Sequence, residues 1–394
     1  MFDAVSSFFT ILAAFVAGIV LNVLVLFGVT DNPVLLTSPT PERSATTAPL
    51  VNPDSEIVVS NAPQEETKEK DAPLAVPNEE PLREKEESST PVLPVASAQI
   101  TPLVSATPVI SEADLNTEAR AALVNIFCTT KEGSVLNSIT GSGVMIDRRG
   151  IILTNAHIAQ FFLLKDYKYE GHTNCLIRTG APAQPAFKAE PIYISLPWIE
   201  KNAHTLVEEN PKGTGEDDFA LLRITESVGS GITIPSIFAY MTPDMNESTL
   251  IAGGPILLAA YPAGFLDGAT VQKDLWPASA ISTIKEIFTF ATDTLDLLST
   301  GGSVVAQKGS SGGGVFSMAT GKLIGIVVTS SDEGSTGDRD LRAITLSHIN
   351  RSMFGDTGMD LNAFLSGDIA ERQKNFQETR AVIMRQILFD VLNK

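Results

Sequence analysis

Short apolar segments separated by turn residues run through the chain from about residue 120 to residue 350. Gly, Asn, Asp and Pro lie between these segments at loop-like spacings, and no long helical pattern alternates with them. This spacing predicts an antiparallel all-β sandwich or barrel and argues against a parallel α/β sheet. The segments are residues 134–146, 150–155, 219–224, 255–261, 312–316 and 322–328.

Two helical patterns flank this β-rich part. Ser111 followed by Asp114 is typical of a helix N-cap with an acid in the first turn. Near the other end, residues 368–394 place apolar side chains at helical spacing, which predicts an amphipathic helix that docks on its own domain. The apolar side chains are Phe376, Ile383, Met384, Ile387, Leu388, Val391 and Leu392. We therefore expect a β-rich domain over residues 113–355 and a helical extension over residues 356–394.

The N-terminal segment is long, apolar and free of charge. Residues 4–30 contain no charged side chain, and about 20 apolar residues suffice to cross a bilayer as a helix. The alternative is a cleaved signal peptide, but the run exceeds the usual length of about 7–15 residues, no basic segment precedes it and no clear A-x-A site follows. We predict a transmembrane anchor over residues 1–30. We expect the N-terminus inside and the domain on the periplasmic or extracellular side.

A proline-rich segment follows the predicted anchor. Residues 31–112 contain 13 of the 23 prolines, together with Ser, Thr, Ala and a charged run from residue 64 to 87. Such a composition buries too little apolar surface to offset the entropy of the chain, so we predict a disordered linker. Two interpretations stay open, a spacer that holds the domain away from the membrane and a solvated tail of no special length.

The chain is acidic, with 46 Asp and Glu against 28 Lys and Arg and a net charge of -18. Of these, 16 acidic but only 5 basic side chains fall in residues 1–117. Nucleic-acid affinity rests on Lys and Arg that neutralise phosphates, and the sequence contains no basic stripe. We therefore expect no nucleic-acid partner.

The two cysteines leave two alternatives open. Cys128 and Cys175 form a disulfide if the domain faces an oxidising compartment, or else they are two buried thiols. His172 and Cys175 make an HxxC pair, which lacks the two further ligands that a zinc site needs. We expect no metal site.

Three short motifs carry candidate chemistry. His157 ends the sequence LTNAH, a carboxylate precedes the apolar run in EDDFALL (216–222), and a serine lies in the glycine-rich sequence KGSSGGG (308–314). A serine hydroxyl becomes a nucleophile when a neutral imidazole removes its proton. A buried carboxylate fixes the tautomer of that imidazole and stabilises the imidazolium. The order His, Asp, Ser therefore predicts nucleophilic catalysis.

The glycines around Ser311 predict a second feature of the same chemistry. They allow the backbone to turn sharply, so that the amides of Gly309 and Ser311 point at one spot where an oxyanion develops. One such donor is worth about 3–4 kcal/mol in the transition state.

These motifs resemble those of trypsin/chymotrypsin-fold serine peptidases, in particular the HtrA-like bacterial branch. The resemblance covers about residues 120–350 and rests on GSGVMIDRRGIILTNAH (141–157), DFALL (218–222), GSSGG (309–313) and AAYPAG (259–264). It implies two packed antiparallel β-barrels with the site in the cleft between them. It also implies that His157 is the general base and acid, Asp218 orients it and Ser311 is the nucleophile.

The family pattern also decides between neighbouring residues. The catalytic Asp directly precedes the aromatic or aliphatic residue of the strand, which favours Asp218 over Asp217 and leaves Asp217 as a solvated neighbour. The nucleophile precedes the paired glycines, which favours Ser311 over Ser310. Ser310 also stands where digestive members have an aspartate, so activation through a salt bridge to a new N-terminus is not expected.

The residue six positions before Ser311 is Val305, and not the aspartate that selects Lys or Arg side chains. If Val305 lines the specificity pocket, the resemblance implies cleavage after small or medium apolar residues. HtrA-like members usually add a C-terminal PDZ domain, but only 83 residues follow Ser311, so we expect none here.

We thus expect a membrane-anchored serine endopeptidase that acts on protein or peptide substrates, needs no cofactor and contacts the membrane through its N-terminal helix. One alternative is a catalytically silent module that keeps the fold and captures a peptide at the cell surface. Another is a hydrolase of esters.

Overall fold

The computed structural model describes residues 110–131, 134, 136–208, 211–228, 231–290, 293–330 and 335–394. The predicted anchor and all but the last three residues of the predicted linker lie outside the described residues. In the part of the chain that is described, no helix combines the length and the apolar character that a membrane span requires.

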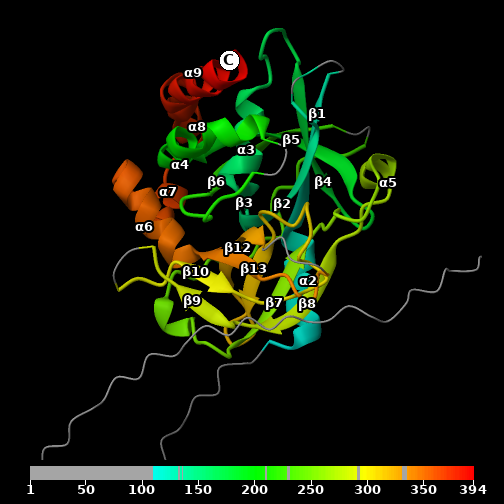
Figure 1. The fold of residues 1–394 in the computed structure, drawn as a ribbon, viewed down its shortest axis with the longest axis vertical. Coiled ribbons are helices and arrows are strands. Elements are labelled where there is room, and N and C mark those ends of the chain that lie inside the picture. Colours follow the sequence, from blue (N-terminus) through cyan, green and yellow to red (C-terminus); the bar gives the residue numbers. More distant parts are fainter. Residues whose placement is uncertain are drawn as a thin grey trace, which may run out of the picture. The chain divides into compact units, whose positions relative to one another are not determined.

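A closed six-stranded barrel, in the order β1-β2-β3-β6-β5-β4, forms the first half of the domain (Figure 1). Helix α2 (Glu112–Ala122) leads into it, and the Ser111 hydroxyl caps this helix by accepting a hydrogen bond from the Asp114 amide at 3.1 Å. All neighbouring strands of the barrel are antiparallel. The strands are β1 (Leu123–Thr130), β2 (Ile139–Asp147), β3 (Ile151–Thr154), β4 (Thr173–Thr179), β5 (Gln184–Ile194) and β6 (Ala220–Ser227).

A second, seven-stranded antiparallel sheet has the order β8-β7-β11-β12-β13-β10-β9. The all-β antiparallel prediction is confirmed, but this second layer ends at β8 and β9 instead of closing into a second barrel. Its strands are β7 (Pro255–Ala260), β8 (Ala278–Thr283), β9 (Glu286–Phe288), β10 (Leu297–Ser299), β11 (Gly314–Ser317), β12 (Leu323–Ser330) and β13 (Leu341–Thr345).

Two clusters of buried apolar side chains form the core. The larger cluster fills the barrel with residues such as Ile126 and Ile152, includes second-sheet residues such as Phe316 and Ile326, and extends to the C-terminal helices through Met384. A smaller cluster in the second sheet includes Ile256, Leu258, Val305, Val315 and Ile324. Strands β3 and β11 are buried at every residue, which explains why their sequences, IILT and GVFS, show no alternation of apolar and charged side chains.

Short helices connect the strands. They are α3 (Ala156–Leu163), α4 (Leu196–Asn202) and α5 (Gly268–Lys273), with the 3-10 turns η1 (Ala203–Val207) and η2 (Glu247–Thr249). Helix α3 starts directly after β3, so the chain leaves a central barrel strand and turns into a helix within two residues.

The C-terminal part forms four helices and not one long helix. They are α6 (Leu346–Thr357), α7 (Leu361–Ser366), α8 (Ile369–Glu378) and α9 (Arg380–Leu392). The expected boundary at residue 355 falls inside α6, and the helix expected over 368–394 is interrupted at Thr379, whose φ of -121° and ψ of -85° are not helical.

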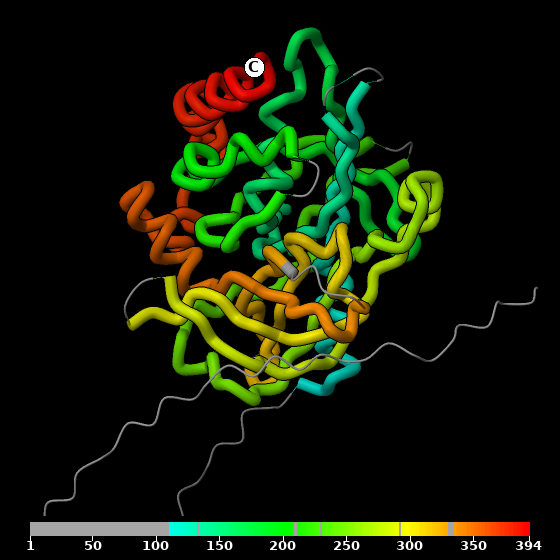
Figure 2. Tube along the Cα trace, in the orientation of Figure 1, coloured from blue at the N-terminus to red at the C-terminus, as the bar shows by residue number. Residues whose placement is uncertain are grey.

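Helices α8 and α9 pack on the first barrel, on β5, α4 and η1 (Figure 2). Most of the apolar side chains expected to dock are buried or pack on the core, whereas Ile383 is 53% exposed. Met384 and Leu388 are fully buried. Ile383 and Met384 are adjacent and both apolar, so the sequence pattern alone does not separate the buried side chain from the exposed one.

Candidate active site

His157 lies in the first turn of α3, at the point where the chain leaves β3. Strand β3 is fully buried, and Asn155 between the two elements has an extended backbone. The Asn155 side-chain amide donates to the backbone carbonyl of Asp218 at 2.9 Å. This contact joins the end of β3 to the start of β6 and places His157 beside the loop that carries Asp218.

Asp218 holds His157 through both carboxylate oxygens. Its Oδ1 accepts from the His157 backbone amide at 3.0 Å, and its Oδ2 lies 2.7 Å from His157 Nδ1. Asp218 is 4% exposed, while 30% of the His157 side chain is exposed. A carboxylate at Nδ1 assigns the ring proton to that nitrogen, which leaves Nε2 as an acceptor in the neutral ring. The pair therefore has the geometry of an oriented general base.

The loop that carries Ser311 is fixed to the first barrel by backbone contacts. The Ser142 amide donates to the Ser311 carbonyl at 2.7 Å, and the Ser142 hydroxyl donates to the Gly309 carbonyl at 2.8 Å. The Ser142 carbonyl in turn accepts from the Thr154 hydroxyl at 2.7 Å, three residues before His157. Among the described residues no hydrogen bond joins the Ser311 hydroxyl to His157.

Gly312 explains why this close approach needs glycine. Its φ is +82°, and a Cβ at this position would lie 2.1 Å from the Ser142 carbonyl oxygen and 2.5 Å from Thr154 Oγ1. Any side chain would push the serine loop away from the strands that lead to His157.

The Gly309 amide is oriented by a neighbouring loop. The Lys308 carbonyl accepts a hydrogen bond from the Ala263 amide at 2.8 Å. Because the C=O and N–H of a trans peptide point in opposite directions, the Gly309 N–H points away from Ala263. Within the described part of the chain neither this amide nor that of Ser311 donates to another residue. Both donors are thus unoccupied, as an oxyanion hole requires.

The two rival residues occupy different surroundings. Ser310 is 1% exposed, and its buried hydroxyl has no partner among the described residues. Asp217 is not the solvated neighbour that the sequence suggested. Its Oδ1 accepts from Ser352 Oγ at 2.5 Å and lies 3.1 Å from His348 Nε2. The two adjacent aspartates therefore face two different histidines.

The sequence motifs gave no role to His348. This side chain is buried at the start of α6, and its Nδ1 lies 2.9 Å from Asp296 Oδ1. Its carboxylate partners are 52 and 131 positions away along the chain. Only the scarcity of histidine, four in 394 residues, would have directed attention to it.

Val305 is fully buried in the smaller core cluster. Its side chain contributes no exposed surface in this structure, and its role in specificity stays a prediction from the sequence.

Cys128 and Cys175 face each other on β1 and β4 and form a disulfide. His172 packs between Tyr167 and Tyr169, and no cluster of potential metal ligands occurs among the described residues.

Comparison with known proteins gives a match over the part of the chain that holds these motifs. Residues 141–326 match the family model described as "Trypsin-like peptidase domain". Two solved structures of the HtrA-type protease AlgW with tripeptide, one of them of a variant, are each 18% identical with a TM-score of 0.39.

Each match covers 64% of this chain and 65% of the AlgW chain, slightly less than two thirds of its length. No curated protein matches the chain.

Proposed function

We propose that this chain, whose residues 141–326 belong to the trypsin-like peptidase domain family, is a membrane-anchored serine endopeptidase that works through an acyl-enzyme intermediate. His157 removes the proton of the Ser311 hydroxyl and later protonates the leaving amine, while Asp218 holds the ring and stabilises the imidazolium. The Gly309 and Ser311 amides stabilise the oxyanion. This chemistry requires no metal or cofactor.

The observation that carries the proposal is the contact of Asp218 with His157, 2.7 Å from carboxylate to Nδ1. It occurs beside a serine loop whose carbonyls are bonded to Ser142 and whose amides are unoccupied in the described part of the chain. A fold that retained only a binding role would not need a buried carboxylate on a partly exposed histidine next to such a loop.

A fluorophosphonate probe tests the proposal directly, because it reacts with serines that are activated as nucleophiles. The full-length chain, purified in detergent, should be labelled, and Ser311→Ala should abolish the labelling. His157→Ala should reduce it strongly, and Ser310→Ala is the matched control. A well-folded wild-type chain that takes up no probe would contradict the proposal and favour the silent binding module.

Comparing the turnover of peptide amides with that of simple esters separates a peptidase from an esterase.

Specificity is proposed for small or medium apolar residues on the acyl side of the cleaved bond, because the chain has Val305 where Lys- and Arg-specific members have an aspartate. Profiling with a peptide library tests this. Preferred cleavage after Lys or Arg would contradict it.

The membrane topology is also part of the proposal. The Cys128–Cys175 disulfide supports a location on the periplasmic or extracellular side, since disulfides persist in oxidising compartments. Protease accessibility in intact cells and after permeabilisation tests this location. A domain that is protected in intact cells and digested only after permeabilisation of the cytoplasmic membrane would place it inside.

A further inference from the structure

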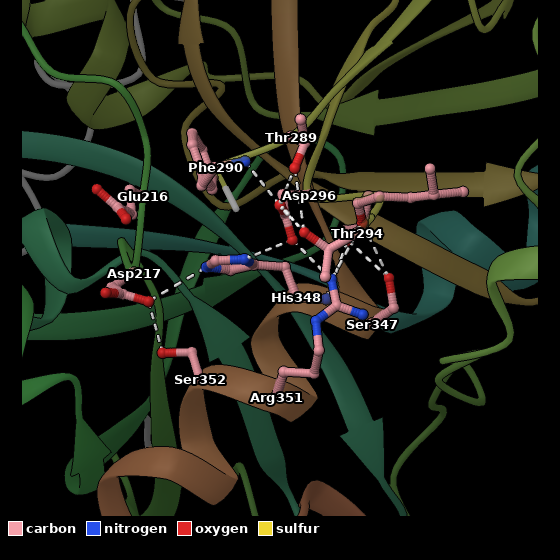
Figure 3. Close-up of polar contacts among 12 residues, drawn as sticks. Glu216, Asp217, Thr289, Phe290, Thr294, Asp296, Ser347, His348, Arg351 and Ser352 are labelled. Atoms are coloured by element: carbon pink, nitrogen blue, oxygen red, sulfur yellow. Dashed lines mark hydrogen bonds and ion pairs between the residues drawn. The ribbon is translucent and has the colours of Figure 1, made fainter. Parts of the chain in front are cut away.

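A second histidine, His348, lies between the carboxylates of Asp217 and Asp296 (Figure 3). His348 Nδ1 is 2.9 Å from Asp296 Oδ1, and His348 Nε2 is 3.1 Å from Asp217 Oδ1. Asp217 also accepts from the Ser352 hydroxyl. Asp296 also accepts from Arg351 at 2.6 Å. The proposed triad uses none of these side chains.

The geometry of the cluster requires a charged ring. A neutral imidazole has one N–H and one acceptor nitrogen, so it can donate to only one of two carboxylates. With both ring nitrogens within hydrogen-bond distance of carboxylate oxygens, the satisfied state is the imidazolium, which donates on both sides. The His348 side chain is only 11% exposed. In a neutral ring, the unprotonated nitrogen would face a carboxylate oxygen with no proton between them, and both atoms are hydrogen-bond acceptors.

The two carboxylates outweigh the effects that oppose a protonated ring. Burial lowers the pKa of His348, but the hydrogen bonds and charges of Asp217 and Asp296 raise it more, so that this pKa lies above its ordinary value. The first turn of a helix disfavours a positive charge, and His348 lies in the first turn of α6. Arg351 adds positive charge to Asp296 from the same helix, and Glu247 of η2 pairs with Arg351.

The remaining charges nearby belong to the loop before Asp218. Glu216 pairs with Lys201 of α4 at 2.8 Å on the exposed side. For Asp217, burial raises the pKa, whereas the hydrogen bonds from His348 and Ser352 lower it more, so the pKa lies below its ordinary value. Asp217 is thus an anion that faces the His348 ring.

The loop before β6 has two residues in the left-handed region of backbone conformation. Asp217 has a φ of +58°, in the left-handed region that non-glycine residues rarely adopt. Two residues earlier, Gly215 has a φ of +83°, and a Cβ there would lie 2.6 Å from Val328 of β12. The Asp218 amide donates to the Gly215 carbonyl at 3.2 Å. The conformation of this loop therefore determines where Asp218 lies.

We propose that the protonated His348 ring, held between Asp217 and Asp296, positions the loop that presents Asp218 to His157. Asp296 is anchored in the segment between β9 and β10, where its Oδ2 accepts from the Phe290 amide at 2.7 Å. Through His348 this second-sheet segment fixes Asp217, and the next residue along the chain is Asp218. His348 is a positioning residue, and loss of one of its ring protons breaks the link from Asp296 to Asp217 at one of its two hydrogen bonds.

The experiment compares His348→Gln with wild type in the full-length chain, and the inference rests on the proposed peptidase function. We expect kcat for a peptide substrate to fall about tenfold with KM nearly unchanged, because a small displacement of a catalytic group lowers turnover without removing substrate contacts. The matched control is His172→Gln, which removes another buried histidine that lies outside this cluster and should leave kcat unchanged.

Two further readouts separate positioning from a general loss of structure. If His348 acts through Asp217, adding His348→Gln to Asp217→Asn should lower kcat no further than Asp217→Asn alone. The wild-type kcat should also decline at alkaline pH as His348 loses its proton, and this decline should be missing from His348→Gln. Additive losses, or the same alkaline decline in both proteins, would overturn the inference.

A measurement that does not need turnover keeps this inference separate from the proposed function. With only four histidines in the chain, nitrogen NMR of the imidazole rings can follow each one. His348 should stay doubly protonated to higher pH in wild type than in Asp217→Asn, and the signal of the His157 Nδ1 proton should shift in His348→Gln. Unchanged signals would overturn the inference even if the enzyme is active. A wild type without peptidase activity whose His157 signal shifts as expected would contradict the proposed function alone.

Discussion

Two histidine–aspartate sites lie on either side of one loop, and they differ in what surrounds the ring. His157 contacts one carboxylate and has 30% of its side chain exposed, whereas His348 lies between two carboxylates and has 11% exposed. One carboxylate leaves the second ring nitrogen available to exchange a proton, while two carboxylates hold both protons in place. In the proposed mechanism the same residue types therefore give a proton carrier at His157 and a cation held between two carboxylates at His348.

The adjacent aspartates provide the sharpest test of this comparison. Asp218→Asn should lower kcat about 10⁴-fold, because an amide no longer holds His157 in the required tautomer. Asp217→Asn should lower it only about tenfold, because it disturbs the position of the loop and leaves the Asp218 carboxylate intact. Steady-state kinetics on one peptide substrate measures both. Equal losses in the two variants would show that the distinction between the two sites is wrong.

The oxyanion loop gives the next largest effect, because it belongs to the His157 site only. In Gly309→Ala the new Cβ would lie 2.8 Å from the Tyr261 carbonyl oxygen, at a φ of +92°. The peptide must shift and its amide donor is misplaced, so kcat should fall about 10²–10³-fold.

Gly358→Ala is the matched control for this glycine variant. Its φ is +74°, but a Cβ there meets open space. It should cost about 1 kcal/mol of stability and leave kcat unchanged. A Gly309→Ala enzyme with normal turnover would remove the Gly309 amide from the proposed mechanism.

The sequence predicted the His157 site better than the His348 site for a physical reason. His157, Asp218 and Ser311 each lie in a short motif whose glycines, strand or helix start is visible locally. The His348 cluster has no such motif, because Asp217, Asp296 and His348 come from three distant segments that only the tertiary fold brings together. Asp217 was predicted to be solvated for the same reason: its partners His348 and Ser352 are distant in the sequence.

The same contrast holds for the fold. Strands β3, β7 and β12 were predicted because their apolar runs are bounded by turn residues. Strand β5 was missed, because two prolines and two charged residues interrupt its apolar pattern. Among the apolar side chains predicted to dock, Ile383 is exposed, since packing on α4 and η1, and not the sequence pattern alone, decides which side of α9 is buried.

The stability contributions of the two buried histidines His348 and His172 should depend on pH with opposite signs. Because the folded pKa of His348 lies above its ordinary value of 6.5, its contribution is complete below about pH 6.5 and is lost as the pH rises through the folded pKa. The pKa values of Asp217 and Asp296 are lowered, because hydrogen bonds outweigh the effect of burial. Their contribution is present above about pH 4 and is lost below it. The Tm difference between wild type and His348→Gln should thus be largest between about pH 4 and 6.5.

His172 gives the opposite sign and serves as the control. Burial, and then the charges of Lys168 and Lys131, lower its pKa, so its neutral form is favoured in the folded state. Wild type should therefore lose stability relative to His172→Gln as the pH falls below about 6.5. A Tm difference for His348→Gln that grows as the pH rises would mean that this ring is neutral in the folded protein.

The smallest expected effect comes from Ser352, whose hydroxyl donates to Asp217 at 2.5 Å. Ser352→Ala removes one of the two groups that hold Asp217 and leaves His348 in place, so we expect a loss of about 1 kcal/mol in stability and less than about threefold in kcat. Ser347→Ala is the matched control, because this hydroxyl lies on the same helix but bonds to Thr345 and to the Leu295 carbonyl. It should lower stability and leave kcat unchanged. If both variants reduce kcat equally, helix α6 affects the site through its general stability and not through the hydrogen bonds to Asp217.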